Sequence, residues 1–134
     1  MDTTTFEKDI KVFYVPAETF PDGIEAAYKK LHSILPQLKE RRFFGLSRME
    51  NGVIAYKAAA EILNPEEQDK TKLDTEVISK GKYIYRTIHD FMEDLPAIGN
   101  TFEELLEEPG IDLNAYCVEW YVNKDVKCMV KLKE

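Results

Sequence analysis

The stretch from Ala115 to Leu132, AYCVEWYVNKDVKCMVKL, decides the fold. Its two ends are rich in Val, Tyr and Trp, a composition typical of two short strands joined by a tight turn at Asn123 to Asp125. The unusual member is Glu119, a carboxylate between Val118 and Trp120. A charged side chain in such a strand costs free energy unless it is solvated, paired or used. The functional interpretation of the chain depends on which of these conditions holds.

The register of this hairpin determines which side chains share a sheet face with Glu119. A three-residue loop at 123–125 predicts the cross-strand pairs Val122–Val126, Trp120–Cys128 and Val118–Val130. Glu119 then shares its face with Tyr121, Lys127, Met129 and Lys131. In this register Glu119 is a solvated residue near lysines, and the more apolar face carries Trp120. The same register places Cys117 and Cys128 on opposite faces, so we expect two free thiols.

The first half of the chain contains signals for a strand, a helix and a hairpin. Lys8 to Val15 is a predicted strand that Pro16 stops. Apolar residues at helical spacing predict a helix over 22–38, with Asp22 as its cap. Arg42 to Arg48 and Val53 to Leu63 are predicted strands joined at Asn51-Gly52, a strong hairpin signal.

The second half repeats this order of elements. The polar stretch 64–74 is a predicted surface loop. Lys82 to His89 alternates apolar and polar side chains and is a predicted strand. A helix is predicted over 94–108, with Pro96 in its first turn and Pro109-Gly110 after its end. The Ala115–Leu132 hairpin follows. The order strand, helix, strand, strand therefore occurs twice, which predicts an α+β fold: two βαββ repeats forming an antiparallel sheet with two helices packed on it.

Length and composition restrict the classes of function. The 134 residues, 44% hydrophobic, fit one domain over 1–134 with one core. A formal net charge of -7 argues against direct binding of nucleic acid, which needs clustered Lys and Arg. No apolar run approaches the ~20 residues that span a bilayer, and the N-terminus lacks a signal-peptide pattern. We expect a cytoplasmic protein that does not enter membranes.

Four short motifs, in order and spacing, resemble the GyrI-like family, the effector-binding domain of bacterial transcription activators. They are FFGLSR from Phe43, VIAYKAAAEI from Val53, SKGKYIYRTIH from Ser79 and VEWYV from Val118. The resembling features are Gly45, the Gly81-Lys82-Tyr83 run and Glu119-Trp120-Tyr121. The chain departs from the family at Asp90, where a glycine is common, and at Lys131, where a proline is common. No helix-turn-helix precedes the domain, so a stand-alone member is implied.

The resemblance implies a small-molecule groove between the two helices and the sheet. Some family members bind lipophilic cations, often many different drugs, with a central glutamate and aromatic walls. The implied ligand-binding residues are Glu119, Tyr121, Trp120, Tyr56, Tyr83 and Phe44. The favoured function is binding of a hydrophobic, cationic small molecule. Other members hydrolyse cyclopropane-containing genotoxins, and for such a hydrolase the implied catalytic residues are Glu119 and Tyr121. A third alternative is a protein-interaction module with a partner such as DNA gyrase.

The remaining polar residues give no sign of a metal or cofactor. His32 and His89 have no partners at metal-ligand spacing, and the two cysteines do not form a Cys-x-x-Cys pair. No Gly-rich phosphate loop is present. We therefore expect neither a metal nor a cofactor. The glutamates at 103, 104, 107 and 108 are most simply the solvated face of the second helix, with an acidic patch for a basic partner as the alternative.

Overall fold

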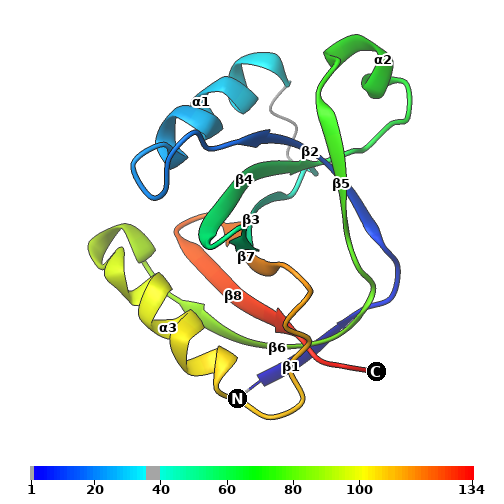
Figure 1. Cartoon of the computed structure of the whole chain (residues 1–134). Coiled ribbons are helices and arrows are strands. Elements are labelled where there is room, and N and C mark those ends of the chain that lie inside the picture. The colour runs from blue at the N-terminus through cyan, green and yellow to red at the C-terminus, as the bar shows by residue number, and fades with distance from the viewer. Residues whose placement is uncertain (1, 36–39) are drawn as a thin grey trace.

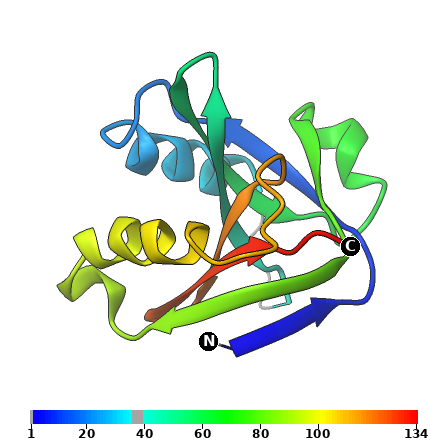
Figure 2. The same ribbon diagram turned by 60° about the horizontal axis from the view of Figure 1, so that its bottom comes forward.

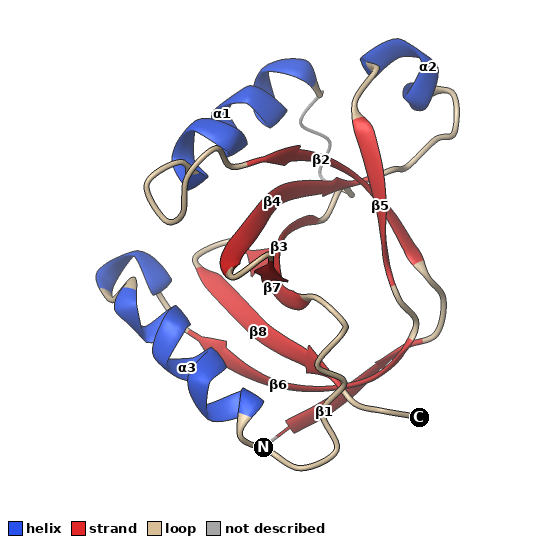
Figure 3. Ribbon diagram, in the orientation of Figure 1, coloured by secondary structure: helices blue, strands red, loops and turns tan. Residues whose placement is uncertain are grey.

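The computed structural model describes residues 2–35 and 40–134. An eight-stranded, wholly antiparallel sheet carries the helices (Figure 3). The elements in chain order are β1 (Asp2–Phe6), β2 (Ile10–Pro16), α1 (Ile24–Ile34), β3 (Phe43–Glu50), β4 (Val53–Glu61), α2 (Glu67–Thr71), β5 (Asp74–Ile78), β6 (Gly81–Ile88), the 3-10 turn η1 (Phe91–Glu93), α3 (Pro96–Leu106), β7 (Cys117–Val122) and β8 (Asp125–Lys131). The α+β class is confirmed.

Two short connections force the sheet to curl. The strand order is β1-β6-β8-β7-β3-β4-β2-β5, so β1 and β5 are the two edges. Three residues join β1 to β2, and two residues join β5 to β6, although each pair spans nearly the whole sheet. A flat sheet cannot be crossed by so few residues, because neighbouring strands lie about 4.8 Å apart. The sheet therefore bends until its edges approach each other, with β5 opposite the central strands in Figure 1.

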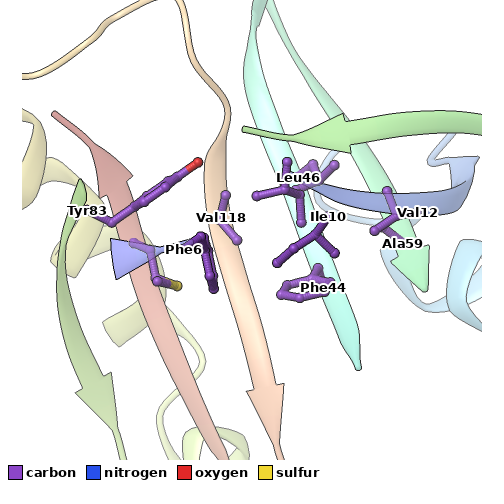
Figure 4. Close-up of a cluster of buried hydrophobic side chains, with 10 residues drawn as sticks. Phe6, Ile10, Val12, Phe44, Leu46, Ala59, Tyr83 and Val118 are labelled. Carbon is purple, nitrogen blue, oxygen red and sulfur yellow. The ribbon is translucent and has the colours of Figure 1, made fainter. Parts of the chain in front are cut away.

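Apolar side chains fill the inside of this curl. The inner cluster consists of Phe6, Ile10, Val12, Phe44, Leu46, Ala59, Ile78, Tyr83, Val118 and Met129 (Figure 4). These residues come from both edges and from the centre of the sheet, so burying them holds the curl closed. Each large side chain buried in this way contributes about 1.5–3 kcal/mol.

The helices α1 and α3 pack on the opposite face of the sheet, which we call the helix face (Figures 1 and 2). From α1, Ala27 and Leu31 pack on Phe13 and Ala58. From α3, Phe102 and Leu105 pack on β6 and β8 in a second, separate cluster. The two helices thus cover the two ends of this face and leave the central strands β3 and β7 between them.

Most predicted elements are present, with shifted ends. The segment after Asn51-Gly52 is a strand despite its three alanines, and residues 51 and 52 both have positive φ as that turn requires. The first helix begins at Ile24 with Gly23 at its N-cap, so Asp22 does not cap it; residues 36–38 of the predicted helix lie outside the described residues. The predicted loop 64–74 is wrong in part, because it contains α2. The arrangement as two repeats stays a prediction.

The predicted register of the last hairpin is wrong by one residue. The turn has two residues, Asn123 and Lys124, because Val122 already pairs with Asp125. Glu119 consequently faces Cys128, whose neighbours on that face are the apolar Val126 and Val130. The lysines predicted to surround Glu119 belong to the other face of β8. In the observed register Glu119 is therefore buried, whereas the predicted register made it a solvated residue.

Candidate functional site

Strand alternation brings a small set of polar side chains to the centre of the helix face. Along β7, Cys117, Glu119 and Tyr121 point to this face, and Val118 and Trp120 pack with the inner cluster. Gly45 of β3 lies opposite Glu119 in the register. Since α1 and α3 cover only the ends of the face, these residues form the floor between the helices.

Glu119 is buried and held by two tyrosines. Glu119 is only 8% exposed to solvent. The Tyr56 hydroxyl donates a hydrogen bond to Glu119 Oε1 at 2.8 Å, and the Tyr121 hydroxyl donates to the same oxygen. Tyr56 reaches it from β4, two strands away, and Tyr121 lies on the same strand. Both donors satisfy one carboxylate oxygen, so a ligand can approach the other.

Gly45 makes room for this arrangement. A Cβ atom at position 45 would lie 2.1 Å from the Tyr56 hydroxyl oxygen and 2.7 Å from Glu119 Oε1. Both distances are shorter than any real Cβ contact. Only glycine therefore lets the tyrosine cross β3 and meet the carboxylate, which gives a physical reason for the glycine in the FFGLSR motif.

Tyr28 connects helix α1 to this network. Its hydroxyl donates to the Phe44 carbonyl at 2.8 Å and lies 2.9 Å from the Tyr56 hydroxyl. The Tyr28 ring also packs edge-on against the Tyr121 ring, with centroids 5.8 Å apart. On the α3 side, the Phe91 ring lies 5.2 Å from the Tyr121 ring. Aromatic rings from both helical segments therefore surround the floor.

Burial governs the acid-base properties of the site. Burial raises the pKa of Glu119 above its ordinary value, and the hydrogen bonds from Tyr121 and Tyr56 only partly oppose this shift. Burial also raises the pKa values of Tyr28, Tyr56 and Tyr121, so all three remain protonated donors at neutral pH. Among these four groups, the Glu119 carboxyl is thus the one whose pKa starts in the acidic range and is moved upward from there.

A groove of about 1860 Å³ opens above this floor, between α1 and α3. Glu119, Tyr121, Tyr28 and Phe91 line it, together with residues from the β3–β4 hairpin and the segment before β7. Among the described residues, the carboxylic acids that line it are Asp22, Glu25, Glu50, Glu103, Asp112 and Glu119, and Arg48 is the one Lys or Arg. Arg48 is paired with Glu50 at 2.7 Å. The groove therefore has aromatic walls and an excess of acidic residues.

The structure brings together some of the sequence-predicted site residues and separates others. Glu119 and Tyr121 line the groove, and Tyr56 lies beneath them in hydrogen-bond contact. Phe44 and Tyr83 belong to the inner cluster on the other face, and Trp120 packs against it. Those three side chains do not reach the groove.

Several residues of the site were missed. Tyr28 appears in the sequence only as a member of an apolar helix stripe, which gives no sign that its hydroxyl binds the sheet. Phe20 and Phe91 lie in connecting segments without periodicity. The ring of Phe20 lies 6.0 Å from that of Tyr56. Only the fold shows that these loops converge on Glu119.

Both cysteines are free. The argument that predicted this was wrong, because Cys117 and Cys128 lie on the same face in the observed register. Cys117 lines the groove. Burial raises its pKa to about 11 and that of Cys128 to about 12, so neither is a thiolate at neutral pH.

The residues that the structure describes contain no group of three or more His, Cys, Asp or Glu placed to hold a metal ion. Their helices also include none long and apolar enough to cross a membrane.

Comparison with known proteins relates this fold to several solved structures. No protein-family model and no curated protein matches the chain. An integron cassette protein from the mobile metagenome of Vibrio cholerae has 16% identity and a TM-score of 0.72, over 98% of this chain and 95% of that one. SAV2435, solved bound to tetraphenylphosphonium, has 11% identity and a TM-score of 0.67, over 97% of this chain and 93% of that one.

A third structure, from Staphylococcus aureus MU50 and described as a bacterial transcription regulation protein, has 11% identity and a TM-score of 0.64. The match covers 99% of this chain and 97% of that one. At these identities the likeness concerns the fold. It agrees with the fold that the resemblance to the GyrI-like effector-binding domain predicts.

Proposed function

We propose that this protein binds hydrophobic cations in the groove between α1 and α3, with the ionised carboxylate of Glu119 facing the positive charge. The observation that carries the proposal is the position of Glu119: a buried carboxylate at the floor of a large aromatic groove, with no cation paired to it among the described residues. A buried charge without a counter-ion is costly, and a cationic ligand would remove that cost.

The walls favour a hydrophobic rather than a hydrated cation. Aromatic rings from Tyr28, Phe91 and Tyr121 stand around the carboxylate, and ring faces attract cations that shed water easily. The excess of acids along the groove repels anions and steers cations toward it. The solved neighbour that carries tetraphenylphosphonium has the same fold, and its ligand is a cation of this class.

The test is the Glu119→Gln variant, which keeps the shape and the acceptor for both tyrosines but removes the charge. A charge-assisted contact in a buried site is worth about 1.5–3 kcal/mol. We therefore expect affinity for a cationic rhodamine ester to fall about tenfold or more. Affinity for the neutral dihydro form of the same dye should stay within about twofold.

The matched control is Glu108→Gln, an exposed glutamate that follows α3 and does not line the groove. It removes the same charge from the protein and should leave both affinities unchanged. If Glu119→Gln binds the cationic and neutral dyes as the wild type does, the carboxylate does not take part in binding and the proposal fails.

A hydrolase of strained, electrophilic substrates is the second candidate. The observation that favours it is the buried Glu119 carboxyl at the floor of the groove, because burial raises its pKa and a carboxylate with a raised pKa is a stronger general base for water. Tyr121 and Tyr56 would hold that base in place. Incubation with a cyclopropane-containing alkylating compound separates the candidates: a hydrolase gives a ring-opened product with turnover, and a binding protein returns the compound unchanged. A DNA gyrase partner stays a prediction.

A further inference from the structure

Exposed apolar side chains are concentrated along the groove. Twelve large hydrophobic residues are exposed among the described parts of the chain, and seven of them line the groove. Leu113 is 74% exposed and Met92 is 70% exposed. Apolar surface gathered in one concave place indicates a site that is covered when occupied. The groove thus offers contact area for a ligand well beyond the surroundings of Glu119.

Five of these seven residues belong to two opposite ends of the groove. Met49 and Ile54 pair at the tip of the β3–β4 hairpin, next to the end of β3 where Ser47 faces Cys117. Leu113 comes four residues before Cys117, the β7 residue that faces Ser47, and this places it on the side of the same end. Met92 and Leu95 lie in and after η1, at the other end. There, Phe91 contacts Tyr121 and its amide donates to the Lys124 carbonyl.

Glu119 lies between the two ends. In the register of β3 with β7, Phe43 faces Tyr121 at one end, Ser47 faces Cys117 at the other, and Gly45 faces Glu119 in the middle. From Phe43 to Met49 the floor extends roughly 20 Å, since a strand rises about 3.3 Å per residue. The negative charge therefore has an apolar surface on both sides of it.

From this placement we infer that the groove selects cations whose charge sits in the middle of the molecule, between two hydrophobic arms. A ligand of this shape can put its charge on Glu119 and one arm on each apolar end at the same time. A ligand with its charge at one end must leave one apolar end uncovered. The inference rests on the proposed function and adds to it the position of the charge within the ligand.

The experiment compares two isomers of identical composition and charge: dioctyldimethylammonium, with a central charge and two eight-carbon arms, and pentadecyltrimethylammonium, with a terminal charge and one long chain. Binding is measured by calorimetry below the critical micelle concentration of each. We expect the central-charge isomer to bind about tenfold more tightly or better, because several more methylene groups are buried while the charge stays on the carboxylate.

Two variants test the two ends separately. Met92→Ala removes apolar side-chain surface at one end of the groove, and Leu113→Ala removes it at the other. Both residues are exposed, so neither change should disturb folding. Each should weaken binding of dioctyldimethylammonium about threefold to tenfold. Val53→Ala is the control, because Val53 is 65% exposed on the β3–β4 hairpin but does not line the groove. It should change nothing.

The outcomes distinguish this inference from the function on which it rests. If pentadecyltrimethylammonium binds as tightly as its isomer, or if only one of the two end variants weakens binding, the central-charge inference is overturned. The proposed function then survives, provided that Glu119→Gln still weakens the binding of both isomers. If neither isomer binds in a manner that depends on Glu119, the inference and the proposed function both fail.

Discussion

The two faces of the central strands β3 and β7 both carry aromatic side chains but differ in what lies at their centre. On the inner face, Trp120 packs with its ring centroid 6.0 Å from that of Phe6 and 6.0 Å from that of Phe44, around aliphatic neighbours. On the helix face, the rings of Tyr28, Tyr121 and Phe91 stand around the carboxylate of Glu119 and an open groove. Aromatic content therefore does not identify a site; an unneutralised polar group among the rings does.

The tyrosine hydroxyls show the same difference. On the inner face, the Tyr83 hydroxyl donates a hydrogen bond to the backbone carbonyl of Ser79 at 2.7 Å, a local contact between residues four apart in sequence. On the helix face, Tyr56 donates to a carboxylate 63 residues away in sequence. The first contact satisfies a buried hydroxyl, whereas the second holds a charge in place.

The largest effect is expected at Phe44, on the inner face. Phe44 is fully buried, and Phe44→Ala should lower the free energy of unfolding by about 3–5 kcal/mol, as measured by the midpoint of urea denaturation. Its backbone carbonyl, which accepts the Tyr28 hydroxyl, is kept. The preference for cationic over neutral dye should therefore be unchanged. A changed preference would show that the two faces do not act separately.

The adjacent residue, Gly45, should give the reverse pattern. In Gly45→Ala the new methyl group would displace the Tyr56 hydroxyl and Glu119, so we expect cation affinity to fall more than tenfold. Overpacking should cost about 1–3 kcal/mol of stability. Gly110→Ala is the matched control: Gly110 does not line the groove, a Cβ there meets nothing within 4 Å, and its φ of 81° makes alanine costly for stability without changing the floor. Unchanged cation binding by the Gly45→Ala protein would contradict the proposed geometry of the floor.

Sequence patterns were sufficient for the centre of the fold and insufficient for its edges. Val53 to Leu63 was predicted to be a strand because of the Asn51-Gly52 turn before it, and the structure has this strand over Val53–Glu61, with positive φ at both turn positions. The edge strands β1 and β5 were missed, since Asp2–Phe6 is mostly threonine and Asp74–Ile78 begins with polar residues. Both are fixed by pairing with distant strands and by the short connections that curl the sheet, which no local pattern contains.

The environment of Glu119 depended on one residue of register. Asn123-Lys124 lacks the glycine typical of a two-residue turn, so a three-residue loop was the natural interpretation, yet Asn123 adopts a φ of 56°. Asparagine tolerates this conformation better than most residues. Because side chains alternate with period two, the one-residue error exchanged Cys128 for lysines beside the carboxylate. Composition and motifs cannot correct such an error, because they are the same for both registers.

The measurement that tests the central claim most directly is the titration of the Glu119 side-chain carboxyl by carbon NMR, in the free protein and with a saturating cationic ligand. In the free protein the pKa should lie above the ordinary value of about 4.3, because burial disfavours the charged form. A bound cation favours the charged form, so the pKa should fall on binding, and affinity should weaken as the pH drops through the free-state value. A pKa at the ordinary value that does not move when the cation binds would contradict the account.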